Sequence, residues 1–405
     1  MAKENYGLMY VQMPDQLWSL DVCKLLQRPP TPRPKEETPR PRPEFEFLCN
    51  YQYHERHPEG LRGRLPFGMK CMMVDSKLHM VGGYWKNMYV NETPAGWANL
   101  DVYACEPIEG DADADADADV DGTPKAKAKE EEEEEGPSPL PSIRLRKSST
   151  IPSLSGPKID PIVVTLEDKI YALSQSHRGD VQAYCPALFE VFDPNTRLWT
   201  VLPNPPFTRG RLDGLYISHH LACGHKLVVY PLDRDDREPC IFDTRKKKWE
   251  YTQYLERDIG NVNGFAQYRD FLIGVLRASA SCYKCLQLVA YELDSNGIPN
   301  LYRVLTERDD MFYHAYEFKE IFEPIFTINV GGDGLMCFIY YGIGRSRGVR
   351  LSVGLFRIFT DESERDGWRI YARREAAVET YYLKHASDGV EDPNIYSAVV
   401  SRTLA

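Results

Sequence analysis

The sequence predicts an all-β fold built from repeated four-stranded antiparallel units, and three observations favour it. Short apolar runs rich in β-branched and aromatic residues alternate with turn residues along most of the 405-residue chain. Few stretches keep a helical apolar period; the segment from Asp310 to Phe322 is the candidate for a short helix. Finally, two strand patterns recur in the same order, which indicates a repeat architecture.

The first recurring pattern is a hairpin: an apolar strand, a tight polar turn and a second apolar strand. It occurs five times, and the intervals between the first apolar residues after successive turns are 92, 57, 44 and 64 positions. These residues are Leu78, Ile170, Leu227, Phe271 and Leu335. The longest interval contains an acidic insertion, so the underlying repeat is shorter than that interval.

The second pattern follows each hairpin and is clearest in FEVFDPNTRLW and CIFDTRKKKW. In both, an aspartate precedes a tryptophan by six residues: Asp193 with Trp199, and Asp243 with Trp249. Aspartate and proline favour a turn between two strands. We expect the two tryptophans to occupy equivalent, largely buried positions and to pack between neighbouring units.

Hairpin and tryptophan pattern together give one four-stranded blade. A single blade cannot bury both of its faces, so the blades are expected to be arranged radially as a β-propeller. Five repeats are visible, and strand-like segments at the two ends, YGLMYVQMPDQLWSLDV and NIYSAVVSRT, supply a further blade. The sequence therefore predicts six blades, closed by the N- and C-terminal strands, which removes two exposed edges.

From residue 67 to residue 373 the chain resembles the kelch-repeat, galactose-oxidase-type β-propeller, in the plant variety often found behind an F-box. The motifs are FEVFDPNTRLW followed by LPNPPF, CIFDTRKKKW, and KLHMVGG with the double glycine Gly82-Gly83. The resemblance implies protein recognition, including substrate recognition for a ubiquitin ligase, although no F-box or BTB segment is visible. Galactose oxidase carries a copper site of tyrosines and histidines, and no motif marks such a site here.

Residues 1–405 are predicted to form one domain that two low-complexity stretches interrupt. Residues 28–43 hold seven prolines and a net charge of +3, and residues 106–150 contain a run of acidic residues, so both are expected to be disordered loops. Both lie between the third and fourth strands of neighbouring blades, which places them on one face. Outside residues 106–136 the chain has 46 basic and 46 acidic residues, which argues against binding nucleic acid.

The candidate partner-binding residues are arginines in or next to the loops that join the second and third strands of several blades. In a four-stranded meander these loops converge on the face opposite the two low-complexity stretches. The alternative is that they are solvated loops without a partner. The residues are Arg178, Arg234, Arg237, Arg345, Arg347 and Arg350.

The densest group of metal-ligand types is His219, His220, Cys223 and His225. Alternate residues of a strand point to opposite faces, so this run does not form a tetrahedral site without a distorted backbone. The lone pair Cys282 and Cys285 supplies two ligands of four. We expect no metal and no cofactor.

No motif of a known enzyme class is present, so a non-enzymatic protein that binds a protein partner is the favoured function. A metal-dependent enzyme that uses the propeller channel is the alternative. No apolar stretch is long enough to cross a membrane and no secretory signal is visible, which predicts a location in the cytoplasm or nucleus. We expect the protein to be a monomer. Ser148 and Ser149, beside basic residues, are candidate phosphorylation sites.

Overall fold

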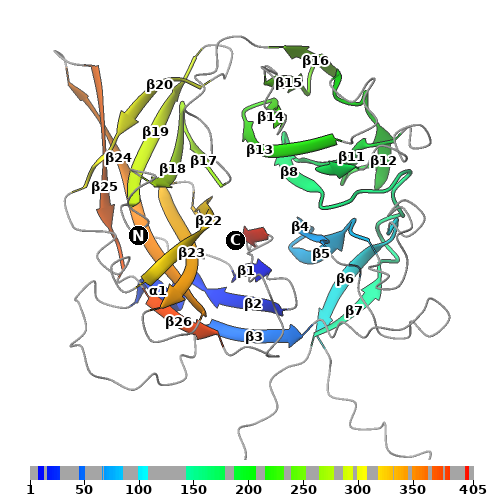
Figure 1. Ribbon diagram of the computed structural model, residues 1–405, viewed down its shortest axis with the longest axis horizontal. Helices are drawn as coiled ribbons and strands as arrows, with labels where there is room; N and C mark the ends of the chain where they lie inside the picture. The colour runs from blue at the N-terminus through cyan, green and yellow to red at the C-terminus, as the bar shows by residue number, and fades with distance from the viewer. Residues whose placement is uncertain are drawn as a thin grey trace, which may run out of the picture.

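The protein is described here from a computed structural model, and its strands lie in six sheets arranged around a centre (Figure 1). The described residues are 8–12, 16–27, 45–50, 66, 68–84, 99–107, 143–177, 187–206, 215–231, 239–251, 264–277, 286–294, 299–307, 318–331, 333–344, 349–363, 367–376, 379–383 and 397–400. Together they form an all-β propeller, as the repeats predict.

Five sheets are blades, each built around one continuous four-stranded meander. Blade 1 contains β4 (Lys70–Val74), β5 (Lys77–Val81), β6 (Val102–Pro107) and β7 (Ile143–Lys147). Blade 2 contains β8 (Ile162–Leu166), β9 (Lys169–Leu173), β11 (Phe189–Asp193) and β12 (Leu198–Val201). Blade 3 contains β13 (Leu215–Cys223), β14 (Lys226–Pro231), β15 (Cys240–Asp243) and β16 (Lys248–Tyr251).

Blade 4 contains β17 (Ala266–Tyr268), β18 (Phe271–Arg277), β19 (Leu286–Leu293) and β20 (Pro299–Val304). Blade 5 contains β22 (Phe318–Asn329), β23 (Leu335–Gly344), β24 (Val349–Ser363) and β25 (Gly367–Arg374). Three short strands extend blades 3 and 5: β10 (Ser176–His177) pairs with β13, β21 (Thr306–Glu307) pairs in parallel with β25, and β26 (Glu379–Leu383) pairs with β24.

The sixth sheet joins the two ends of the chain, as predicted. Its order is β27 (Ser397–Val400), β1 (Leu8–Gln12), β2 (Gln16–Asp21) and β3 (Phe45–Asn50), and Met9 pairs with Val400. The short helix α1 (Val22–Leu26) follows β2. The expected count of six blades is therefore corrected: five blades are continuous repeats, and this closing sheet, drawn from both ends, completes the ring.

Hydrophobic packing between neighbouring sheets holds the ring together. Blade 1 shares a buried cluster with blade 2, blade 2 with blade 3, blade 3 with blade 4, and blade 4 with blade 5. The closing sheet packs against blade 5 on one side and blade 1 on the other. The core therefore lies between the blades, because burial of apolar surface from two sheets stabilises each contact.

The meander divides the molecule into two faces. We call one the turn face; it holds the turns between first and second strands and between third and fourth strands. The other is the loop face, which holds the connections between second and third strands. Contacts between turns of neighbouring blades show that these turns share a face: Arg197 pairs with Asp75, and Arg245 pairs with Glu167.

Two predicted segments differ from the structure. Strand β7 (Ile143–Lys147) lies inside residues 106–150, the range expected to be disordered, and pairs with β6. Strand β22 occupies Phe318–Phe322 in place of the expected helix end, because it pairs with β23 along the blade. Residues 28–43 lie outside the described residues, as does the acidic stretch itself.

Within the described part of the chain, no helix has the length and apolar character needed to span a membrane.

Candidate interaction surface

Trp199 and Trp249 occupy equivalent places in blades 2 and 3. Each pairs across the strands with a phenylalanine, Phe192 or Phe242, in the register set by the preceding aspartate. Each indole Nε1–H donates to a proline carbonyl in the connection that precedes its blade, at 3.0 Å for Trp199 and 2.7 Å for Trp249. Their burial differs: Trp249 is 9% exposed, whereas Trp199 is only half-buried.

The turns before the two tryptophans are built as the sequence predicts. Asp193 accepts a hydrogen bond from the backbone N–H of Asn195, and Asp243 accepts from the backbone N–H groups of Arg245 and Lys246. Arg197 and Lys247 close these turns with a positive φ. The side-chain hydrogen bond from Lys169 lowers the pKa of Asp193.

The double glycine Gly82-Gly83 allows a close approach between blade 1 and the segment that leads into blade 2. Both residues have a positive φ, and the N–H of Gly83 donates to the carbonyl of Lys158 at 2.8 Å. A Cβ at Gly82 would lie 2.8 Å from the same oxygen, which leaves no room for a side chain. Glycine is therefore required here by conformation and by space.

Lys158 also forms a fully buried ion pair that the sequence did not reveal. Its Nζ lies 2.6 Å from Oε1 of Glu190 on β11, and both side chains have no exposed surface. Lys158 Nζ further donates to the carbonyls of Gly156 and Ala187, while Glu190 accepts from the N–H groups of Ser155 and Gly156. Because its polar atoms are hydrogen-bonded, this pair fixes the segment between blades 1 and 2.

The candidate partner-binding arginines lie at or beyond the limits of the described residues. Arg178, Arg234, Arg237, Arg345 and Arg347 lie outside them, and Arg350 is described only as part of β24, where it pairs with Gly342. The strands on either side place the connections between second and third strands of blades 2 to 5 on the loop face. These connections are residues 174–188, 232–239, 278–285 and 345–348.

The histidine and cysteine run does not come together around one point among the described residues. His219, His220 and Cys223 belong to β13, and His225 lies in the turn after it. Cys223 is fully buried, and burial raises the pKa of its thiol to about 12. His225 lies 3.7 Å from Asp243 of its own blade. No group of three potential ligands is found in the described part of the chain.

Ser148 and Ser149 differ in exposure. The Ser148 hydroxyl is buried and accepts hydrogen bonds from the N–H groups of Thr150 and Ile151, so it holds the turn after β7. Ser149 is exposed. Of the two candidate phosphorylation sites, Ser149 alone offers a side chain open to solvent.

A line of turn-to-turn contacts runs across the turn face from blade 1 to blade 3. Arg197 of blade 2 pairs with Asp75 of blade 1, and Arg245 of blade 3 lies 2.8 Å from Glu167 of blade 2. Thr244 donates a hydrogen bond of 2.7 Å to the same glutamate. The hydrogen bonds from Thr244 and Arg245 lower the pKa of Glu167.

A groove of about 420 Å³ lies on the turn face between blades 2 and 3. Its floor is apolar and includes Val191, Leu202 and Phe242, all of them buried. Leu198, 59% exposed, lines one wall, and the polar lining includes Lys169, Asp193 and Lys247. The groove thus combines an apolar floor with charged walls, which is the usual composition of a binding site.

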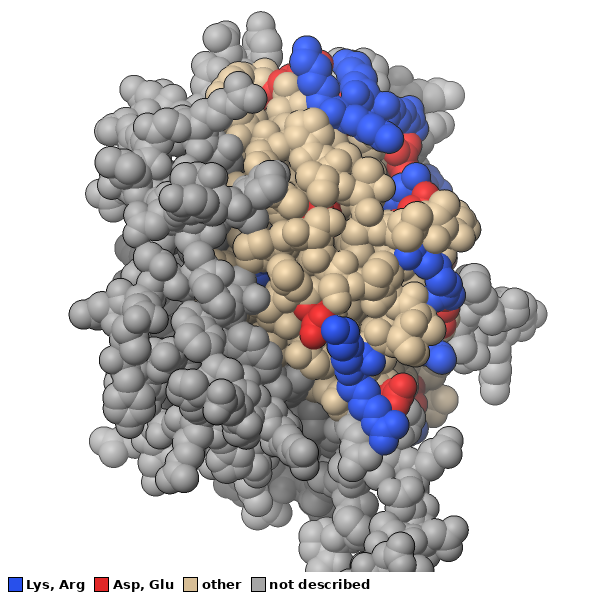
Figure 2. Space-filling view, turned by 90° about the vertical axis from the view of Figure 1, so that its right-hand side faces the viewer, with Lys and Arg blue, Asp and Glu red and all other residues tan. Residues whose placement is uncertain are grey.

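The turn between β15 and β16 brings a basic run beside this groove. Residues 243–248 contain one acidic and four basic residues. In the described part of the chain, neither Lys247 nor Lys248 forms an ion pair. Figure 2 shows that lysines and arginines on this side gather along one edge, whereas most of the middle carries no charge. The three consecutive lysines of CIFDTRKKKW are the sequence signal for this basic run.

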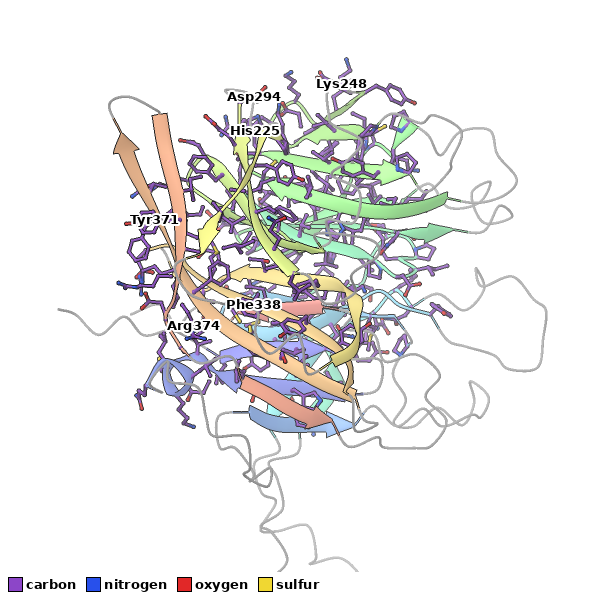
Figure 3. The ribbon with its side chains drawn as sticks, turned by 60° about the vertical axis from the view of Figure 1, so that its left-hand side comes forward. His225, Lys248, Asp294, Phe338, Tyr371 and Arg374 are labelled. Carbon is purple, nitrogen blue, oxygen red and sulfur yellow. The ribbon has the colours of Figure 1, made fainter. Side chains whose placement is uncertain are left out.

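Lys248 and His225 of blade 3 lie in the upper part of Figure 3, at some distance from Tyr371 and Arg374 of blade 5. The side chains around Tyr371 in blade 5 pack against one another. Tyr371 stacks on Phe359 with ring centroids 5.1 Å apart, and Arg373 lies over Phe359 at 5.0 Å. The groove of blades 2 and 3 is therefore separate from the aromatic surface of blade 5.

Residues 121–254 match a family model described as a protein of unknown function (DUF1668). The match covers less than half of the chain and includes blades 2 and 3, so it takes in both tryptophan repeats and the groove. No curated protein matches this sequence.

Proposed function

We propose that this protein is a non-enzymatic propeller that binds a protein partner on its loop face. The observation that carries the proposal is the meander itself: it brings the connections between second and third strands of blades 2 to 5, two of which contain two arginines each, to one face of a rigid scaffold. Loops positioned by a rigid scaffold are where binding residues concentrate.

The proposed contact residues are the arginines at positions 178, 234, 237, 345, 347 and 350. Arginine is favoured at protein interfaces because its planar guanidinium binds carboxylates through two hydrogen bonds. The resemblance to kelch propellers found behind F-box segments supports a partner that is a substrate of a ubiquitin ligase. A partner with acidic side chains at its contact surface fits Arg345 and Arg347, whose connection contains no acidic residue.

A metal-dependent enzyme is the competing function, and the chemistry of Cys223 argues against it. A cysteine binds metal as a thiolate. The apolar cluster around Cys223 raises the pKa of its thiol to about 12, so the thiolate form is disfavoured at neutral pH. Metal content of the purified protein, measured by mass spectrometry, tests this point: one tightly bound transition metal per chain would favour the enzyme.

The proposal is tested by affinity capture from the protein's own cells with the double variant R345E/R347E. The matched control is K24E/R146E, which changes the charge equally at two exposed residues outside the proposed contact set. We expect a protein captured by the wild type and by the control to be lost with R345E/R347E. Equal capture by all three proteins would exclude the loop-face arginines, provided that circular dichroism shows the same fold.

A further inference from the structure

We propose that the groove between blades 2 and 3 binds the chain's own acidic segment, residues 108–142. The inference concerns the turn face and goes beyond the proposed partner site on the loop face. It rests on the charge of the groove, on the place where the acidic segment leaves the fold, and on the length of that segment.

The lining of the groove holds two acidic and two basic side chains, and the basic turn of residues 243–248 beside it makes the edge of the groove positively charged. Asp193 pairs with Lys169 at 2.9 Å, and Glu167 pairs with Arg245 at 2.8 Å, so both acidic groups of the groove are neutralised. Lys247 remains, with no ion pair in the described part of the chain, and Lys248 follows it. An anionic ligand would therefore meet ammonium groups at the edge and apolar surface below.

The acidic segment starts and ends on the same face as the groove. It connects β6 to β7, the third and fourth strands of blade 1, and Pro107 pairs directly with Ile143 at its two ends. Blade 1 packs against blade 2, whose strands form one wall of the groove. The line of contacts from Asp75 through Arg197 to Glu167 and Arg245 runs in the same direction.

The segment is long enough and acidic enough to reach and bind the groove. It holds thirteen acidic residues and three lysines, a net charge of -10. Thirty-five residues span at most about 115–125 Å when extended. Two sheet spacings of roughly 10 Å separate blade 1 from blade 3, so an excursion to the groove and back is feasible. Tethering also raises the effective concentration of the segment, in the millimolar range for short flexible linkers.

The other low-complexity segment does not fit this site. Residues 28–43 leave the fold from the closing sheet, next to blade 1 on its other side, and carry a net charge of +3. Lysines at the groove repel that segment. Of the two low-complexity segments that leave the fold on the turn face, charge complementarity therefore favours the acidic one as the ligand of the groove.

Zero-length carbodiimide cross-linking of the full-length protein tests the inference, because it joins a carboxylate to an amine only where they touch. We expect cross-links from the acidic residues of 109–135 to Lys246, Lys247 and Lys248 at low salt. They should fade at high salt, since screening shortens to about 3 Å at 1 M. In K247E the cross-links to Lys246 and Lys248 should fall roughly fivefold, the size expected when exposed charge contacts are reversed. K24E, with the same change in charge on α1, should leave them unchanged.

Three results would overturn the inference. Cross-links spread evenly over exposed lysines, or equal losses in K247E and K24E, would show that the segment has no preferred site. Cross-links confined to Lys35 would assign the acidic segment to the proline-rich one. Cross-links between isotopically labelled and unlabelled chains in a mixed sample would identify a second copy as the occupant. None of these results bears on partner capture by the loop face, so the two proposals fail separately.

Discussion

Blades 2 and 3 are built differently from blades 4 and 5, although all four are meanders. In blades 2 and 3 a short aspartate turn leads to a tryptophan that bonds the preceding connection through its indole N–H. In blades 4 and 5 a glycine faces an aromatic ring: a Cβ at Gly274 would lie 2.6 Å from Phe265, and one at Gly354 would overlap the ring of Phe338. Both regions pack aromatic side chains; blades 2 and 3 add polar turn contacts, and blades 4 and 5 add glycines that leave room for a ring.

This difference predicts which kind of substitution should reduce the stability of each region. Blades 2 and 3 depend on their hydrophobic cluster and also on a few directional contacts, which fail when one partner is removed. Blades 4 and 5 depend on filled volume, which fails when atoms are added. Removing a side chain that makes such a contact should therefore destabilise blades 2 and 3, whereas adding atoms at a glycine should destabilise blades 4 and 5.

The largest effect is expected from breaking the buried ion pair of the polar region. In E190A the ammonium of Lys158 stays buried without its counter-charge, and the loss should be about 3–5 kcal/mol of unfolding free energy. Urea denaturation measures it. The double variant K158M/E190L should recover most of that stability; if it is as unstable as E190A, shape and not charge is what the pair supplies.

Next in size is Trp249. W249A should cost about 3–5 kcal/mol, as other buried aromatic residues do when truncated. W199A should cost less, because its side chain is only half-buried although its register and hydrogen bond are the same. Thermal denaturation of both variants checks the order. Equal losses would mean that the proline hydrogen bond, which both share, dominates over burial.

In blade 5, the addition of one methyl group at Gly354 should be enough to destabilise the fold. Gly354 pairs across the sheet with Phe338, whose ring has 1% of its surface exposed and cannot move aside freely. G354A should cost about 1–3 kcal/mol by overpacking. The second variant G354A/F338L makes room for the methyl group, and stability at or below that of G354A alone would contradict the explanation.

The smallest effect at neutral pH comes from His79 in blade 1, which lies outside both regions and serves as a reference. Burial lowers its pKa to about 4, below the ordinary 6.5, so the unfolded chain binds the proton first as the pH falls. Stability should therefore decrease between about pH 6.5 and pH 4. In H79Q this part of the pH dependence should be absent, and identical pH profiles for the two proteins would show that His79 titrates normally in the fold.

The sequence predicted the meander well because period-two apolar strands and their turns are local features. The hairpins around Leu78, Ile170 and Leu227, the aspartate turns and the closure by both ends all appear in the structure. It also placed the acidic insertion between the third and fourth strands of its blade, which are β6 and β7. These features depend only on neighbouring residues or on counting strands.

Other features could not be predicted because they depend on distant partners. Strand β21 forms because Thr306 and Glu307 pair in parallel with β25, and these two residues alone do not indicate a strand. The Lys158–Glu190 pair joins residues 32 positions apart, and two charged residues in a chain of charged residues give no signal. The basic run at the groove was visible, but its position beside an apolar floor depends on the packing of blades 2 and 3.

The meeting of β27 with β1 has a practical consequence for engineering. Val400 pairs with Met9, so the last described residue of one strand lies beside the first residues of the other, at the edge where a hairpin turn would stand in a continuous blade. A short linker from residue 400 to residue 8 would therefore turn the closing sheet into an ordinary meander. New chain ends could then be opened in any turn between blades, and a circularly permuted chain of this kind should keep the ring, since every strand retains both of its neighbours.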